Sequence, residues 1–191
     1  MGLRPRAGVL VPAPRLAVNI HGLSEVPHLR DAVVRHHLTE WPKPEGRLDP
    51  ATWGNLGDPT LTAREDHIPL TLVATLDGRY VGQGSIIARD LDHRLYRDRG
   101  PWMGGLCVVR EYRGNGIGKK LHFERLRMAA EMGIPELFLF TERRPYPTVE
   151  LYRRFGWEVE CELPDFDDGS TTERRWVMTV KPSDLFQHEE G

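Results

Sequence analysis

The residues from Val108 to Lys120 combine glycines and basic side chains in a pattern suited to binding an anion. The segment reads Val-Val-Arg-Glu-Tyr-Arg-Gly-Asn-Gly-Ile-Gly-Lys-Lys and leads from an apolar run into a helix-forming run. Glycines at such a junction let consecutive backbone N–H groups turn toward one point, and a helix N-terminus adds partial positive charge. Lys119 and Lys120 would strengthen this field. The segment therefore predicts a phosphate-binding site.

The spacing of the glycines excludes two common nucleotide-binding motifs. A P-loop, G-x-x-x-x-G-K-[ST], would need Gly in place of Arg113 and Ser or Thr in place of Lys120. A dinucleotide fingerprint, G-x-G-x-x-G, would need Gly in place of Lys119 or Leu121. The pattern that fits is R-x-x-G-x-G, which runs from Arg113 to Gly118.

Hydrophobic periodicity predicts a series of alternating strands and helices that would position this loop. We expect strands at 16–20, 70–76, 80–87, 102–109, 137–140, 157–163 and 175–180, and helices from an N-cap at Ser24 to about 40, at 61–66, at 117–132 and from Pro147 to Phe155. Asp77-Gly78 between two β-rich runs predicts a hairpin. Helices between strands, with hairpins in the middle and at the end, predict a mixed α/β sheet with helices on its faces.

Composition limits the class of protein. With 191 residues, of which 39% are hydrophobic, we expect one domain at 15–182, a flexible N-terminal tail at 1–14 and a polar C-terminal tail at 183–191. The net charge of −2 argues against a nucleic-acid partner, and no run approaches 18 uncharged apolar residues, so we expect no membrane span. Cys107 and Cys161 form neither a disulfide framework nor a zinc motif, which favours a cytoplasmic location.

The glycine motif lies among neighbours that suggest a family. An apolar Leu106–Val109 strand precedes the motif, and Leu151 to Trp157 reads Leu-Tyr-Arg-Arg-Phe-Gly-Trp. The chain thus resembles, over about 16–180, the GNAT superfamily of acetyl-CoA-dependent N-acetyltransferases, which carries Q/R-x-x-G-x-G/A at a strand-to-helix turn and an L-Y-x-x-x-G-F element. The resemblance implies an α/β GNAT (acyl-CoA N-acyltransferase) fold, with a mixed, mostly antiparallel sheet of about seven strands splayed at its centre and helices on both faces.

The resemblance also implies acetyl-CoA as a co-substrate, no metal, and a set of binding residues. The pantetheine arm would lie like an added strand along the backbone of Leu106, Cys107 and Val108. The pyrophosphate would be held by the N–H groups of the loop, which are those of Arg113, Gly114, Asn115, Gly116, Ile117, Gly118 and Lys119. Independently of any family, Gly104-Gly105 inside a strand predicts a bulge. Such a bulge would splay the strand from its neighbour, whereas the alternative is that the two glycines relieve packing.

Transfer from a thioester to an amine needs a neutral amine, a polarised carbonyl and a proton for the thiolate. A Lys-like amine has a pKa of about 10.4 and a thiol has a pKa of about 8.5. At neutral pH the amine must therefore lose a proton and the departing thiolate must gain one. Tyr152 lies on the apolar stripe of its predicted helix and matches the family tyrosine that protonates the CoA sulfur, although a core tyrosine is the alternative. The general base is open among Glu142, His93, His122 and a water chain. His122 is expected to be solvated, and the pairs His36-His37 and Cys107 with Cys161 are interpreted as structural.

Three positions depart from the family pattern. Pro145 replaces an Asn, Thr148 replaces a small Ala, and Phe140 stands where some members have a glutamate base. Our first hypothesis is an N-acetyltransferase that acts by direct attack of a primary amine in a ternary complex. The departures support an alternative, a catalytically weak GNAT-fold module that binds CoA or a partner protein. Transfer of a longer acyl group is a third hypothesis.

The acceptor is not identified by the sequence. Seven acids and no base occur between residues 158 and 173, namely Glu158, Glu160, Glu162, Asp165, Asp167, Asp168 and Glu173. They form either a solvated face or a surface that attracts a cationic amine. The glutamates of the predicted strand would point one way and Val159 and Cys161 the other. Trp41 and Trp53 border the site or cover loops. We expect a small-molecule or peptide amine as acceptor, no nucleic acid and no membrane, and a homodimer is an arrangement that the resemblance allows.

Overall fold

The structure, a computed structural model, describes residues 17–42, 68, 70–89, 96, 98–142, 148–163 and 175–186. Its strands are β1 (Val18–Gly22), β2 (Leu70–Leu76), β3 (Arg79–Ile87), β4 (Trp102–Val108), β5 (Leu137–Glu142), β6 (Glu158–Leu163) and β7 (Arg175–Val180). Its helices are α1 (Arg30–Glu40), α3 (Ile117–Glu131) and α4 (Thr148–Arg153), with short 3-10 helices η1 (Pro27–Leu29), η3 (Arg110–Tyr112) and η4 (Pro182–Leu185). The predicted helix at 61–66 lies outside the described residues.

The strands form one sheet in the order β1-β2-β3-β4-β5-β7-β6. β4 and β5 run parallel, and the other neighbouring pairs are antiparallel. At the β2–β3 turn, Asp77 and Gly78 both have positive φ, as a two-residue hairpin turn requires. The prediction of a mixed, mostly antiparallel sheet of about seven strands is confirmed.

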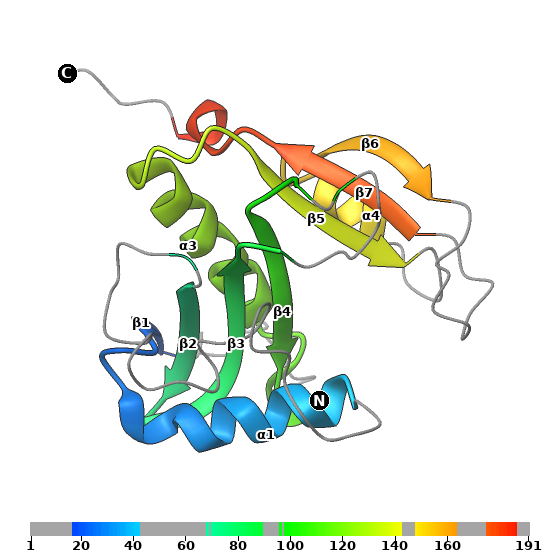
Figure 1. Ribbon diagram of the computed structural model, residues 1–191. Helices are drawn as coiled ribbons and strands as arrows, with labels where there is room; N and C mark the ends of the chain where they lie inside the picture. The colour runs from blue at the N-terminus through cyan, green and yellow to red at the C-terminus, as the bar shows by residue number, and fades with distance from the viewer. Residues whose placement is uncertain are drawn as a thin grey trace, which may run out of the picture.

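The sheet splits between β4 and β5. A single residue pair, Trp102 with Phe138, joins the two strands, and beyond this pair they diverge (Figure 1). On its other side, β4 pairs with β3 from Trp102 to Val108. The predicted splay at the centre of the sheet is therefore present, and it leaves the backbone of β4 without a strand partner on the β5 side after Trp102.

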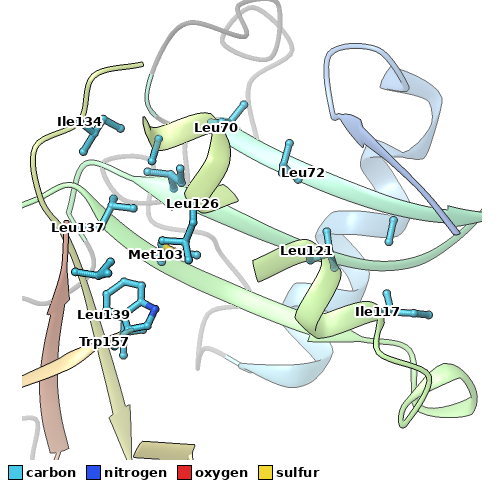
Figure 2. Close-up of a cluster of buried hydrophobic side chains, with 14 of the residues drawn as sticks. Leu70, Leu72, Met103, Ile117, Leu121, Leu126, Ile134, Leu137, Leu139 and Trp157 are labelled. Atoms are coloured by element: carbon cyan, nitrogen blue, oxygen red, sulfur yellow. The ribbon is translucent and has the colours of Figure 1, made fainter. Parts of the chain in front are cut away.

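Apolar side chains alternate between the two faces of the sheet and form two cores. Leu72 and Leu139 join the cluster under α3, which Figure 2 shows, whereas Val73 and Phe138 join the cluster under α1. Helix α1 crosses one face of the sheet, and α3 and α4 lie against the other (Figure 1). The prediction of helices on both faces is confirmed. Among the described residues, no helix is both long and apolar enough to cross a membrane.

Helix α1 begins later than the sequence predicts. Ser24 is not its N-cap, because the 3-10 helix η1 comes first and α1 starts at Arg30. Glu25 Oε1 accepts a hydrogen bond from the Gly22 N–H at 3.2 Å, which closes a turn before the helix. Pro27 then opens η1 without an N–H of its own, so the α-helical hydrogen bonds start only after it. The predicted end of the helix before Trp41 is confirmed.

The prediction that Val159 and Cys161 share one face of their strand is wrong. The register of β6 against β7 shifts between these two residues, which is a β-bulge at Glu160. Val159 packs against the α3-side core and Cys161 against the α1-side core. The extra residue turns the strand over, and Glu160 points outward to bind Arg99 at 3.0 Å.

His122 is buried, contrary to the expectation of a solvated side chain. It is 1% exposed, on the inner face of α3. Trp157 Nε1 donates a hydrogen bond to His122 Nε2 at 3.0 Å, so the imidazole is neutral there. Burial lowers the pKa of His122 to about 3, and the Arg125 cation lowers it as well. The histidine thus acts as a hydrogen-bonding core residue.

This burial predicts a specific pH dependence of stability. Above the usual pKa of about 6.5 the contribution of His122 is fully present, because the histidine is neutral in both states. Below pH 6.5 the unfolded chain binds a proton that folded His122 accepts only near pH 3, so the free energy of unfolding falls by up to about 1.4 kcal/mol per pH unit. Urea denaturation from pH 7 down to pH 4.5 measures this slope.

The matched variant is His122→Gln, which offers Trp157 an uncharged acceptor. This variant is less stable than the natural protein at pH 7 but should lose less stability as the pH falls. Parallel stability curves for the two proteins would show that His122 does not carry the effect.

Candidate functional site

A cavity of about 450 Å³ opens where β4 leads through the glycine loop into α3. Its lining includes Glu40 at the end of α1 and Tyr112 in η3, neither of which the sequence predicted. The predicted residues in its lining are Leu106, Cys107, Val108, Arg113, Gly114, Gly116, Ile117 and Gly118. Most of the predicted binding residues are thus brought together around one hollow.

The backbone of the loop has the conformation that an anion cradle needs. Gly116 is the N-cap of α3 with φ of 78°, in the left-handed region. A Cβ built on Gly116 would meet nothing within 4 Å, so the space beside this helix N-terminus is open. Asn115, whose side chain is not part of that lining, donates from Nδ2 to the carbonyls of Tyr112 at 3.1 Å and Arg113 at 3.3 Å. Asn115 therefore holds the loop in shape.

The side chains of the two lysines after the loop, which the sequence predicts to strengthen its positive field, have contacts outside the cavity lining. Lys120 Nζ donates to the carbonyl oxygen of Val18 on β1. Lys119 Nζ lies 5.8 Å from the ring centroids of Phe123 and Phe155. Because the helical turn carries both side chains away from the loop, the cationic side chain that reaches the cavity is Arg113.

Arg113 is held by two partners across the mouth of the cavity. Its Nε donates to the Val108 carbonyl at 2.8 Å, and its Nη2 binds Glu40 Oε1 at 2.5 Å. An acidic side chain at an anion site weakens it, since the carboxylate repels the anion and competes for the cation. Anion binding alone therefore does not explain why the Glu40 carboxylate lies at this cavity.

The predicted bulge in β4 is present and lies over a buried cation. Between the pairs Gln83–Cys107 and Ser85–Gly104, β4 has two residues where β3 has one, and Gly105 has φ of 59°. The Arg125 guanidinium, 1% exposed, donates from Nη1 to the carbonyls of Ser85 at 3.0 Å and Gly104 at 3.2 Å.

The β3 glycine opposite this bulge makes room for that cation. A Cβ on Gly84 would lie 2.8 Å from Arg125 Cζ. No ion pair joins Arg125 to a carboxylate of the described residues, and burial lowers its pKa to about 10. Carbonyl oxygens at the bulge thus satisfy the guanidinium, and the charge helps to fix the bulge geometry.

Tyr152 lies on the α3 side of the sheet and outside the cavity lining. Its ring centroid is 5.5 Å from that of His122 and 6.2 Å from that of Trp157. Burial raises the pKa of the Tyr152 phenol, and the Arg125 cation partly opposes this shift. The phenol therefore keeps its proton at neutral pH. Leu151 is 47% exposed, and α4, a helix of six residues, has no fully buried side chain.

Polar side chains on the α1 side of the sheet form a network that sequence reasoning missed. His36 Nε2 lies 3.5 Å from Glu40 Oε1, and His36 Nδ1 lies 2.7 Å from the Tyr80 hydroxyl and 3.6 Å from Cys107 Sγ. The Tyr80 hydroxyl donates to Gln83 Oε1 at 2.7 Å. The four-residue spacing of His36 and Glu40 on one helix face was a usable signal. No pattern of neighbouring residues in the sequence indicates that these two side chains lie against β3 and β4.

Several predicted positions cannot be placed. Pro145, His93, Trp53 and the acidic loop from 165 to 173 lie outside the described residues, and the side chain of Glu142 is not described.

Other predicted positions are described. Thr148 Oγ1 lies 2.6 Å from Thr141 Oγ1, and Trp41 is 43% exposed. Cys107 and Cys161 are free thiols. Within the described ranges, no three His, Cys, Asp or Glu side chains group as metal ligands.

Comparison with known proteins identifies relatives of this architecture. The model of a protein family described as the acetyltransferase (GNAT) family matches residues 30–157. No curated protein matches the chain significantly.

Solved structures share the fold at low sequence identity. An acetyltransferase of the GNAT family from Streptococcus pneumoniae is 19% identical with a TM-score of 0.62, covering 86% of this chain and 98% of that one. An aminoglycoside 6'-acetyltransferase type Ii is 20% identical with a TM-score of 0.62, covering 86% and 97%. An aminoglycoside 6'-N-acetyltransferase complexed with coenzyme A is 17% identical with a TM-score of 0.60, again covering 86% and 97%.

Proposed function

Because this chain belongs to the acetyltransferase (GNAT) family, we propose that it transfers an acetyl group from acetyl-CoA to a primary amine by direct attack in a ternary complex. The observation that carries the proposal is the open cradle at Gly116, next to the unpaired edge of β4. The cradle at Gly116 would accommodate a diphosphate, and the edge of β4 would accommodate an extended arm with amide groups. CoA contains a diphosphate followed by such an arm.

We infer the binding residues with the support of this geometry. The N–H groups from Arg113 to Lys119, at the positive end of α3, would bind the pyrophosphate, and the Arg113 guanidinium would add its charge. The backbone of Leu106, Cys107 and Val108 would bond the pantetheine amides as an added strand, because β5 does not pair with β4 there. The solved aminoglycoside 6'-N-acetyltransferase with coenzyme A supports CoA as the co-substrate.

Tyr152 is assigned as the acid that protonates the departing sulfur. Its phenol keeps its proton at neutral pH, since burial raises its pKa. The buried Arg125 cation beside it stabilises the phenolate left after proton transfer. Among the described residues, no side chain or carbonyl takes up the proton of its hydroxyl, which leaves the hydroxyl available to a substrate.

Direct attack is favoured over an acetylated cysteine. Cys107 lines the cavity and lies near His36, which invites comparison with a nucleophilic Cys–His pair. Burial and the Glu40 carboxylate, however, raise the pKa of the Cys107 thiol to about 12. The reactive thiolate is therefore scarce at neutral pH. The alternative of a binding module with weak catalysis rests on the departures at Phe140 and Pro145.

Release of free thiol from acetyl-CoA tests the function. The amines offered are a polyamine, an aminoglycoside, an arylalkylamine and a lysine peptide with a free N-terminus. We expect thiol release with at least one amine and a gain of the acetyl mass on that amine. CoA binding without release for every amine would favour the binding module. A covalently acetylated protein would replace direct attack with a two-step route.

The loop assignment predicts that Gly116→Asp abolishes CoA binding. Asp tolerates a left-handed backbone, so the protein should fold, but its carboxylate would occupy the cradle. Like charges brought together cost several kcal/mol, so calorimetry should show a Kd increase of about 100-fold or more. Gly78→Asp is the matched control, since Gly78 has φ of 75° and open space but lies at the β2–β3 turn. Unchanged CoA binding by folded Gly116→Asp would refute the loop assignment.

Replacing the proposed acid should separate turnover from binding. Tyr152→Phe removes the proton donor while keeping the ring, so kcat should fall by about 100-fold and CoA affinity by less than about 3-fold. The control is Tyr96→Phe, which also removes a buried hydroxyl, one that bonds Cys161 Sγ at 3.0 Å on the other face. Steady-state kinetics and calorimetry provide the two readouts. An unchanged kcat would make Tyr152 a core tyrosine.

A further inference from the structure

The hydrogen bonds around Tyr80 determine which ring nitrogen of His36 carries a proton. The Tyr80 hydroxyl has one proton, and it donates that proton to Gln83 Oε1. It must therefore accept from His36 Nδ1, so the neutral imidazole is protonated at Nδ1. Nε2 then carries the lone pair, and it lies 3.5 Å from Glu40 Oε1. A carboxylate in that position stabilises the imidazolium that forms when Nε2 takes up a proton.

The other groups around His36 do not compete for that proton. Tyr80 faces it from β3 and Cys107 from β4, and burial raises the pKa of both, that of Cys107 to about 12. Both groups therefore stay protonated and neutral at neutral pH. Glu40, on α1, is the anion of the set, and Arg113 reaches Glu40 from the loop. His36 is thus the member of this network that can accept a proton.

His36 also lies close to the part of β4 that follows the bulge. Cys107 Sγ is 3.6 Å from His36 Nδ1, and the bulge at Gly105 lies two residues before Cys107. The His36 side chain is 13% exposed, and two of its neighbours, Glu40 and Cys107, line the cavity. Tyr80 packs with the α1-side core and Tyr152 with the α3-side core. His36 on α1 and Tyr152 on α4 therefore lie on opposite faces of the sheet; Figure 1 shows the two helices on these faces.

His122, a candidate base from the sequence, does not fit that role in the structure. His122 Nε2 already accepts a hydrogen bond from Trp157, and burial lowers the His122 pKa to about 3. A buried imidazole in that state does not take protons at neutral pH. Its place on the α3 side of the sheet, beside Tyr152, also puts it with the proposed acid.

We propose that His36 is the catalytic base of this protein and that Glu40 is its positioning residue, an inference that rests on the transferase function proposed above. His36 Nε2 takes one proton from the bound ammonium, and the neutral nitrogen then bonds to the thioester carbon. The carbon–sulfur bond breaks, the nitrogen gives its second proton to water, and the sulfur takes one proton from Tyr152 on the opposite face. Proton exchange with water then returns both side chains to their starting states, so the net products are the acetylated amine, free CoA and one proton.

This assignment also explains the carboxylate in the anion cavity. In the structure Glu40 Oε1 is shared between Arg113 at 2.5 Å and His36 at 3.5 Å. Phosphate groups of the coenzyme attract the Arg113 guanidinium, which leaves the Glu40 carboxylate to the imidazolium. The base would gain its partner when the acetyl donor is in place.

Two amines of equal chain length but different basicity test the proposal. Ethylamine is mostly protonated at pH 7.5, whereas the fluorines of 2,2,2-trifluoroethylamine keep that amine mostly neutral. His36→Asn keeps a donor toward Tyr80 and removes Nε2, so thiol release with ethylamine should fall by about 100-fold. Release with trifluoroethylamine should change less than about 5-fold, since its proton leaves to water. Glu40→Gln should show the same selectivity with a smaller loss, of about 10-fold.

The matched control is His21→Asn. His21 has the same pairing as His36, with a glutamate four residues on, at 3.5 Å from Glu25, but it lies on β1 at the edge of the sheet. This variant should match the natural protein with both amines. With ethylamine, the rate of His36→Asn should keep rising with pH as the free amine loses its proton, near the pKa of about 10.4 that a lysine-like alkylamine has.

Equal losses with both amines would mean that His36 only supports the structure, and no loss would mean that the base is another group. Either result overturns the inference and leaves the transferase function standing. If the natural protein releases no thiol with either amine or with the amines offered earlier, the proposed function fails, and this inference fails with it.

Discussion

The separation of β4 from β5 is the constraint on which the rest of this structure depends. A parallel pair of strands joined at one position leaves a row of backbone groups that must find another partner. The bulge opposite Gly84 bends β4 at this point, and the buried Arg125 guanidinium holds carbonyl groups on both strands that flank the bulge. The glycine loop follows at the end of the same strand. One strand thus carries an open edge, a bend and, after it, the glycine loop that we propose as an anion cradle.

The two faces of the sheet provide different environments for chemistry. On the α3 side, aromatic and apolar groups surround Tyr152 and keep its phenol protonated. On the α1 side, polar groups connect the loop to the sheet through Glu40 and His36. A reaction that moves one proton from an amine and another to a thiolate benefits from this division, because a neighbouring acid and base would exchange their protons with each other.

Much of the fold follows from local sequence signals. The Asp77-Gly78 turn, the strands around it and the loop before α3 were predicted within a few residues, because turn chemistry and periodicity act over short distances. Errors arose where a longer-range effect intervened. Pro27 and the Glu25 side chain delay α1, and the bulge at Glu160 reverses the faces of β6. The charge of Lys119 and Lys120 was read from the sequence, whereas the contacts of their side chains depend on the fold.

The sequence by itself determined the family, the order of the elements and the backbone that lines the cavity, since each depends on residues close together in the chain. Tertiary structure decided which side chains meet. Tyr80 and Cys107 are 44 and 71 positions from His36 in the sequence, and the three residues meet only because α1 crosses the face of β3 and β4. The state of His122 was likewise set by burial, which depends on the whole core. Side-chain protonation follows the surroundings, and a linear sequence does not contain those surroundings until the chain has folded.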